Sequence, residues 1–336
     1  MQKNTQAEVL QIVAISGLGG IGKSELARKY ACKNKEFYGG NIIWINAEDS
    51  KTMENSFLRL ASRLGVSTKD KSGDNKAIET IIEEIYAFFE DVKSLFIFDN
   101  AEEYEAISKF LPFSLDHKPY ILITSRDRKW EAREEGDIEV IPLDEFDEIE
   151  ALEFVKKALN IQDNLQDKEV EELIRELQHF PLALGQAVAC IYNKNEESWN
   201  VEKFRISDYL KEYRQEAEKL FKETEELLAG EKNGESRVRY AQTVLTTWNI
   251  TRNRIADNKK YGKQAIDVLN IMAYLAPDDI CIREIFLRLM ADDEEKLKNA
   301  VKLLDRYSMI NLRGKIVNIH RLVQKVTRLK LREEGQ

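Results

Sequence analysis

Short apolar runs alternate with helical patterns in the first part of the chain. The apolar runs are rich in β-branched and aromatic residues and show no polar–apolar alternation, which is typical of strands buried on both faces. They are Val9–Ile15, Asn41–Ala47, Ser94–Asp99, Tyr120–Ser125 and Ile138–Leu143. Helical patterns lie between them near residues 22–35, 52–64, 76–91 and 102–110. This order predicts a parallel sheet of five strands with helices on both faces.

The pattern becomes helical after residue 143. Periodicity predicts helices within Asp144–Leu159, Lys168–Gln178 and Pro181–Tyr192, and a long charged helix from about Ser207 to Leu228. The polar, glycine-bearing segment Ala229–Ser236 is the best candidate for a linker.

Beyond this segment, helical patterns near 239–254, 262–275, 282–290 and 293–306 lead into Met309–His320. Two short strands about a turn at Arg313–Gly314, after several helices, suggest a winged helix. We therefore expect an α/β domain over residues 1–143, a helical domain over 144–234 and a winged-helix domain over 235–336.

Composition narrows the class of protein. A chain of 336 residues with 43% hydrophobic and 33% charged residues is typical of a soluble protein with more than one core. A net charge of −9 argues against binding nucleic acid through a broad basic face. No apolar run is long enough for a membrane span or a signal peptide, so we expect a cytoplasmic protein. Cys32, Cys190 and Cys281 lack metal or disulfide spacing and are expected to be reduced thiols.

The segment from Gly17 to Ser24 matches the phosphate-loop pattern G-x-x-x-x-G-K-[ST]. It lies directly between a predicted strand and a predicted helix, as such a loop requires. Glycines let backbone N–H groups converge on phosphates, and the helix N-terminus adds partial positive charge. Lys23 would reach the β- and γ-phosphates, and the Ser24 hydroxyl would ligate Mg²⁺. The residues expected to bind the nucleotide phosphates are Gly17, Gly19, Gly20, Ile21, Gly22, Lys23, Ser24 and Glu25.

A second metal-binding group is expected at the end of the strand Ser94–Asp99. Asp99 would hold the water shell of the Mg²⁺ ion. Many P-loop ATPases place a second acid at the next position to polarise the attacking water, but here that residue is Asn100. An amide orients water without accepting its proton, so hydrolysis should be slow unless Glu102 or Glu103 substitutes. Both glutamates could equally favour the start of the following helix.

Arg126 follows the strand Tyr120–Ser125. Ligands bind outside the carboxyl ends of parallel strands, so this guanidinium could face a γ-phosphate and act as a sensor. A solvated loop arginine is the other interpretation.

Several separated segments, taken in order, resemble the NB-ARC branch of the STAND nucleotide switches. This is the family of apoptotic protease-activating factors, plant immune receptors and NB-ARC proteins with tetratricopeptide repeats. The phosphate loop GLGGIGKSELA, the magnesium-binding strand FIFDN and the sensor strand ILITSR carry the resemblance in the first half. HFPLALGQA, TVLTTWNIT, MAYLAPDDI and NIHRLVQ are similar to the proline-motif and winged-helix segments of the family.

The resemblance implies an ADP-bound closed state and an ATP-bound state able to self-associate. It also implies that Pro181 packs near adenine and that His320 reaches the β-phosphate of ADP. Pro181 could instead be a helix-start proline, and His320 a helix-cap or core histidine. Signalling in immunity or cell death is an expectation from the resemblance.

The sequence departs from the family pattern at three places. Phe180 replaces a glycine–leucine lead-in, Arg321 replaces the aspartate after the histidine, and the adenine-binding Gly-Arg element has no counterpart before the first strand. Effector and sensor modules are also missing, so we expect a module of a larger protein.

Two other functions remain open from the sequence. A winged-helix transcription regulator that binds DNA would use Arg321, Lys325, Arg328 and Arg332, which fall on one helical face. Nucleic acid is nevertheless an unlikely partner, because such charge runs are usually solvated. A phosphotransferase is compatible with the phosphate loop, but no acceptor-binding motif accompanies it.

Overall fold

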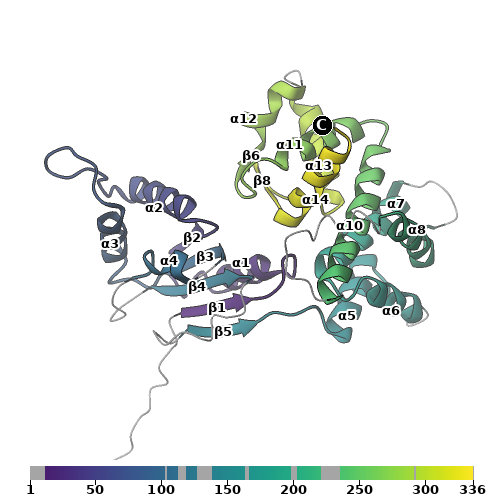
Figure 1. Ribbon diagram of the computed structural model, residues 1–336, viewed down its shortest axis with the longest axis horizontal. Coiled ribbons are helices and arrows are strands. Elements are labelled where there is room, and N and C mark those ends of the chain that lie inside the picture. Colours follow the sequence, from purple (N-terminus) through teal and green to yellow (C-terminus); the bar gives the residue numbers. More distant parts are fainter. Residues whose placement is uncertain are drawn as a thin grey trace, which may run out of the picture. The chain divides into compact units, whose positions relative to one another are not determined.

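The computed structural model describes most of the chain (Figure 1). The described residues are 12–102, 104–112, 119–126, 138–162, 166–197, 203–220, 235–290 and 293–335; the side chains of 235–239 and 289 are not described. The chain divides between Asp144 and Glu145 into two compact units, and each is described by itself. None of the described helices combines the length and apolar character that crossing a membrane requires.

The first unit contains the predicted parallel sheet. Its strands are β1 (Ile12–Ser16), β2 (Ile42–Asn46), β3 (Leu95–Ala101), β4 (Tyr120–Ser125) and β5 (Ile138–Pro142). They lie in the order β2-β3-β4-β1-β5, and every pair is parallel. The predicted five-stranded parallel sheet is therefore confirmed, while residues 9–11 of the first predicted strand lie outside the described part.

Helices cover both faces of this sheet (Figure 1). On one face, α2 (Ser50–Leu64), α3 (Ile78–Phe88) and α4 (Tyr104–Ser108) form the larger core with buried strand residues such as Phe96 and Phe98. On the other face, Ala27 and Ala31 of α1 (Lys23–Lys33) pack on side chains that include Ile97. Consecutive apolar residues in β3 are buried because each face has its own cover.

The helix boundaries follow local chemistry. Asp49 accepts a hydrogen bond from the backbone N–H of Thr52 and so caps the start of α2, while Gly65 ends that helix with a φ of 72°. Asp147 and Glu150 form a reciprocal capping box at the start of α5.

The strand order places three carboxyl ends side by side. β4 lies between β1 and β3, and Ser125 at its end pairs with Ser16 of β1 and Ala101 of β3. The β3–β4 register shifts just before Ala101, so Asp99 and Asn100 form a bulge opposite Thr124. The first loop, the bulge and the residue after β4 therefore share one edge of the sheet.

The second unit begins with a bundle of helices and continues into a mixed segment. The bundle helices are α5 (Glu148–Leu159), α6 (Asp167–Glu176), α7 (Pro181–Glu197), α8 (Ile206–Lys219) and α10 (Glu235–Ala256). The mixed segment holds α11 (Gly262–Met272), β6 (Ile280–Cys281), α12 (Ile282–Phe286), η2 (Leu287–Met290), α13 (Glu294–Arg306), β7 (Ile310–Arg313), β8 (Ile316–Ile319) and α14 (Arg321–Glu333).

The predicted strand pair near Met309–His320 is present as β7 and β8, with Gly314 in the turn at a φ of 63°. β6 was not predicted, because two residues are too few for a periodic pattern; it pairs with β8 in an antiparallel sheet of order β6-β8-β7.

One predicted helix and one predicted linker in the middle of the chain fall partly outside the described residues. A helix was predicted from Ser207 to Leu228, but α8 ends at Lys219. Residues 221–228 of the predicted helix lie outside the described residues. The predicted linker Ala229–Ser236 falls largely on residues 229–234, which are also outside the described part. Its last two residues were assigned wrongly, because α10 begins at Glu235. The three-domain division stays a prediction.

Candidate nucleotide-binding site

The turn between β1 and α1 requires glycine at specific positions. A Cβ atom added at Gly17 would lie 2.2 Å from the backbone oxygen of Leu143. Gly20 and Gly22 have φ values of 80° and 106°, a region that L-residues rarely adopt. Gly22 is also the N-cap residue of α1. The glycines thus give the loop its path and leave the first N–H groups of α1, which have no acceptor within the helix, at the edge of the sheet.

Lys23 lies folded against this loop. Its side chain is 8% exposed, and Nζ donates hydrogen bonds of 2.7 Å to the backbone oxygens of Gly17 and Leu18. Burial, with a further contribution from the Arg126 charge, lowers the pKa of Lys23 to about 8, whereas the Asp99 carboxylate opposes the shift. The ammonium is therefore charged at neutral pH and is ready to exchange carbonyl partners for phosphate oxygens.

One carboxylate oxygen of Asp99 accepts hydrogen bonds from two hydroxyl groups. Asp99 is 4% exposed, and its Oδ1 accepts hydrogen bonds from Ser24 Oγ at 2.6 Å and from Thr124 Oγ1 at 2.5 Å. A serine that donates its proton to a carboxylate keeps its lone pairs for a cation. Carboxylate and hydroxyl oxygens are the ligands that Mg²⁺ prefers.

The donor set at Ser24 and Asp99 thus fits Mg²⁺. Within the described residues, no group of three or more His, Cys, Asp or Glu side chains could hold a metal ion. Ser24 and Asp99 supply two oxygen donors, so an ion held there would take its other ligands from nucleotide phosphates and water.

Asn100 occupies the bulge in an uncommon backbone conformation. Its φ is 66°, and its backbone N–H donates to Thr124 Oγ1 at 2.8 Å. Asparagine tolerates this left-handed region better than most residues. Glu102 is exposed beyond the strand end, and Glu103 lies outside the described residues. Replacement of the missing acid by either glutamate stays a prediction.

Arg126 is exposed directly after β4. Its charge contributes to the lowered pKa of Lys23, so the two cations are close enough to repel each other. The structure therefore brings together the loop, Asp99, Asn100 and Arg126. In the same turn, Ile21 is 4% exposed, while Glu25 points to solvent beside Arg28 at 3.5 Å.

Pro181 and His320 belong to the second unit, and each has a local structural role. Pro181 is the first residue of α7 and follows Gln178 and His179, whose φ values are 54° and 57°. His320 caps α14, where its Nδ1 accepts the backbone N–H of Leu322 at 3.1 Å. Their expected contacts with nucleotide stay predictions.

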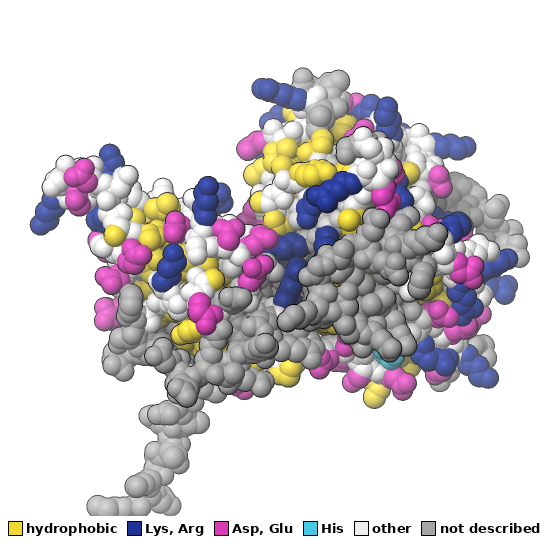
Figure 2. All heavy atoms as spheres, in the orientation of Figure 1, with side chains coloured by type: hydrophobic (Ala, Val, Ile, Leu, Met, Phe, Trp, Pro, Cys, Tyr) yellow, Lys and Arg dark blue, Asp and Glu magenta, His cyan; other side chains and the backbone are white. Residues whose placement is uncertain are grey.

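The basic face proposed for DNA binding is partly used inside the second unit. Arg328 Nη1 donates to the backbone oxygen of Ala273, the residue that follows α11. Arg321 and Lys325 are half-buried, and Arg332 is exposed. On the face drawn in Figure 2, acidic and basic side chains are both spread over the surface.

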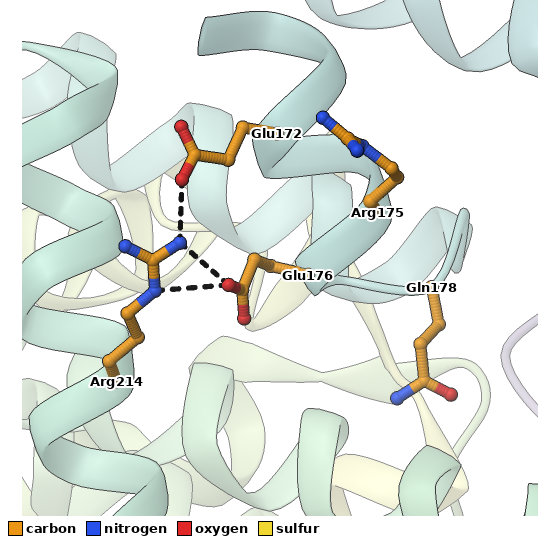
Figure 3. Close-up of a pocket in the computed structure, with 5 residues that line it drawn as sticks. All are labelled: Glu172, Arg175, Glu176, Gln178 and Arg214. Atoms are coloured by element: carbon orange, nitrogen blue, oxygen red, sulfur yellow. Dashed lines mark hydrogen bonds and ion pairs between the residues drawn. The ribbon is translucent and has the colours of Figure 1, made fainter.

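The second unit also contains a polar hollow of about 470 Å³ that the sequence did not indicate (Figure 3). It is lined by Glu172, Arg175, Glu176, Gln178 and Arg214. Arg214 donates to Glu172 at 2.7 Å and to Glu176 at 2.6 Å, so its charge is compensated locally. None of the predicted site residues lines this hollow.

Sequence reasoning missed Thr124, which contacts both Asp99 and Asn100. The available signal was a hydroxyl residue inside an otherwise apolar strand, YILITS, whose burial is nearly complete. A buried hydroxyl needs a hydrogen-bond partner, and here Asp99 and Asn100 of β3 are the partners.

Comparison with known proteins agrees with this geometry. Residues 1–164 match the family model of the NB-ARC domain. This segment is an NB-ARC domain. The resemblance seen in the phosphate loop, FIFDN and ILITSR is thereby confirmed for the first part of the chain.

The relatives extend the similarity beyond the NB-ARC domain. A nucleotide-binding leucine-rich repeat (NLR)-like protein of Hyaloscypha variabilis is 27% identical over an alignment 354 positions long, which covers 97% of this chain. The chain spans about a third of that relative, with 33% of its length covered. A STAND protein with a tetratricopeptide repeat sensor from Pyrococcus horikoshii aligns with a TM-score of 0.53 and 16% identity. That alignment covers 95% of this chain and 40% of the other, and it bears on the fold.

Proposed function

We propose that this chain is an ADP/ATP-binding switch of the NB-ARC type. The observation that carries the proposal is the 2.6 Å hydrogen bond from Ser24 to Asp99 beside the buried ammonium of Lys23. Together these groups supply a cation for phosphates and oxygen ligands for Mg²⁺. The NB-ARC match over residues 1–164 supports a nucleotide as the ligand.

Slow hydrolysis is part of the proposal. Asn100 stands where an acid would take the proton of the attacking water, and an amide has no basicity for that step. Asp99, Asn100 and Arg126 would then orient water and phosphate without supplying a general base. A switch needs different affinities for ADP and ATP in its two conformations, and fast turnover would empty the ATP state.

Adenine recognition is proposed for the region of Pro181. A proline ring has an apolar face and no N–H, which suits the edge of a base pocket. A phosphate loop contacts phosphates and does not distinguish one base from another. The support for adenine is therefore the position of Pro181 in HFPLALGQA and the NB-ARC relationship.

We further propose that residues 235–336 form a winged-helix domain that reports on the nucleotide. The succession of α10, α11 and α13 followed by the β7–β8 hairpin supports this. His320 Nδ1 accepts a hydrogen bond, so the proton of a neutral ring is on Nε2. Nε2 is then the atom that would donate to the β-phosphate of ADP, and loss of that bond would release the domain.

The proposed partners follow from the relatives. The H. variabilis protein is about three times as long as the matched region, and the P. horikoshii protein carries a tetratricopeptide repeat sensor. We propose that effector and sensor modules accompany this module in a longer protein, and that the ATP state self-associates. Cytoplasmic localisation and a role in defence signalling are part of the same proposal.

The test is the identity of the nucleotide released when freshly purified protein is denatured. The switch predicts retained ADP in the wild type and little or none in Lys23→Ala and His320→Ala. Lys325→Ala serves as a control, because it removes a charge from α14 and leaves the His320 cap of that helix in place. A nucleotide-free protein that turns over added ATP rapidly would contradict the switch and favour a phosphotransferase, which substrate-stimulated turnover would then identify.

A further inference from the structure

One threonine hydroxyl connects the two residues of the β3 bulge. Thr124 is 1% exposed in β4. Its Oγ1 donates to Asp99 Oδ1 at 2.5 Å and accepts the backbone N–H of Asn100 at 2.8 Å. A hydroxyl has one proton, so the donor capacity of Thr124 is used on Asp99. The same atom thus holds a side chain and the neighbouring backbone.

The hydroxyl also explains why the bulge is stable. The bulge interrupts the ladder between β3 and β4, and Asn100 adopts a left-handed φ of 66°. A bulge leaves a backbone N–H without its ladder partner, and an unpaired N–H in the interior is costly. Thr124 replaces that missing partner, so a side chain of β4 fixes the backbone of β3.

The two oxygens of the Asp99 carboxylate differ in the hydrogen bonds that they accept. Oδ1 accepts from Ser24 and from Thr124. Among the residues that the structure describes, none donates a hydrogen bond to Oδ2. A carboxylate bound at one oxygen by two hydroxyls from different elements cannot rotate without breaking one of these bonds.

We propose that Thr124 is a positioning residue of the magnesium site, which holds Oδ1 of Asp99 so that Oδ2 accepts from a water of nucleotide-bound Mg²⁺. The inference rests on the proposed function, because the ion arrives with the nucleotide. Thr124 acts through Asp99, and the arrangement of ligands around an ion commonly depends on such outer contacts.

The experiment compares ADP affinity in excess Mg²⁺ with ADP affinity in EDTA, by titration of a fluorescent ADP analogue. Thr124→Val keeps the shape of the side chain and removes both hydrogen bonds. We expect the ratio of ADP affinity in Mg²⁺ to ADP affinity in EDTA to fall about tenfold, with the affinity in EDTA unchanged. Thr124→Ser restores the hydroxyl and should restore the gain.

Ser125→Ala is the matched control. Ser125 is the next residue of β4 and is also buried, and its hydroxyl donates to the backbone oxygen of Ala101 at 2.7 Å. Its removal leaves both hydrogen bonds to Asp99 in place, so the Mg²⁺-dependent gain should stay at the wild-type value.

Several results would overturn the inference. Thr124→Val with the full Mg²⁺ gain would do so, as would Thr124→Ser behaving like Thr124→Val, because packing would then be the cause. If Thr124→Val does not fold, Thr124→Cys, with its weak thiol donor, should show a partial loss, and no loss would reject the proposal. A wild type that binds ADP without any Mg²⁺ gain rejects the inference alone, whereas a wild type that binds no nucleotide rejects the proposed function.

Discussion

The Ser24 hydroxyl donates a 2.6 Å hydrogen bond to Asp99, a residue 75 positions later in the chain. Ser24 follows β1 and Asp99 lies in β3, and these strands are separated by β4. The bond therefore joins two elements that have no ladder between them. It forms only when three strands are in register, which makes the Ser24–Asp99 pair a direct indicator of a correctly assembled site.

Removal of the Ser24 hydroxyl should weaken magnesium-dependent binding. Ser24→Ala deletes a metal ligand and a hydrogen-bond donor to Asp99, so we expect at least about a tenfold loss of ADP affinity in Mg²⁺ and little change in EDTA. Ser24→Thr keeps the hydroxyl and should bind normally. Ser56→Ala, which removes a hydroxyl bonded to its own helix at Thr52, is the control. An unchanged Mg²⁺ dependence in Ser24→Ala would contradict the assignment.

Substitution of Gly17 should destabilise the first unit. The added methyl of Gly17→Ala would meet the Leu143 oxygen at 2.2 Å, so backbone must move. We expect a loss of about 2 kcal/mol in the free energy of unfolding, measured by urea denaturation.

Gly185→Ala is the comparison for Gly17. Gly185 lies inside α7, and an added Cβ would meet no atom within 4 Å. Alanine favours a helix over glycine, so this variant should gain about 0.5–1 kcal/mol. Equal effects of the two substitutions would show that the close approach of Leu143 does not determine the stability.

An acid at position 100 should speed up ATP turnover. Aspartate tolerates the left-handed φ of 66° and adds a proton acceptor where the amide stood. General-base catalysis contributes about 10²–10⁴-fold in enzymes, so we expect Asn100→Asp to raise single-turnover hydrolysis by at least about tenfold. Asn100→Ala supplies no base and should show no increase. If Asn100→Asp hydrolyses ATP at the wild-type rate, another residue already serves as the base.

Arg328 should contribute to the stability of the second unit and not to DNA binding. Its guanidinium donates to the Ala273 carbonyl, one of the groups that a helix end leaves without an intrahelical partner. Arg328→Ala should cost about 1–2 kcal/mol in thermal or urea unfolding, and the exposed Arg332→Ala no more than about 0.5 kcal/mol. A salt-dependent affinity for duplex DNA, weakened alike in both variants, would instead support the transcription-regulator alternative.

The three cysteines should differ in how fast they react with a thiol reagent. Cys32 and Cys281 are exposed, whereas burial raises the pKa of Cys190 to about 11 despite the opposing contact with Thr251. Only a thiolate reacts, and at pH 8 about 0.1% of a group with this pKa is ionised. A thiol reagent should therefore label two cysteines quickly, and the third only in urea or as the pH rises toward 11. Fast labelling of Cys190 at pH 8 in the folded protein would refute its burial.

The sequence predicted those parts of the site that depend on a local pattern. The phosphate loop needs its glycines and Lys23 within a few residues, and β4 was predicted with its observed ends because Tyr120–Ser125 is a compact apolar run. Asp99 was predicted from its place at the end of the apolar run Ser94–Asp99, although β3 continues to Ala101. Each of these inferences uses neighbours in the chain.

The features that sequence reasoning missed depend on neighbours in space. The Asp99–Asn100 bulge exists because Thr124 of another strand supplies a hydrogen-bond acceptor, and no periodicity reports that. Likewise, β6 is defined by pairing of Cys281 with Ile316, and its two residues have no pattern of their own. Gln178 and His179 take positive φ values before α7, although neither is a glycine.

The place of β4 in the sheet has a consequence for biosynthesis. A ribosome releases β1, β2 and β3 before β4, yet β4 must be inserted between β1 and β3. Until Ser125 has left the exit tunnel, the phosphate loop and Asp99 belong to strands with no common neighbour, and the unpaired backbone edges of these strands are exposed to chaperones and to other nascent chains. Nucleotide can therefore assist the folding of this protein only after translation has passed the fourth strand, late in the synthesis of the first unit.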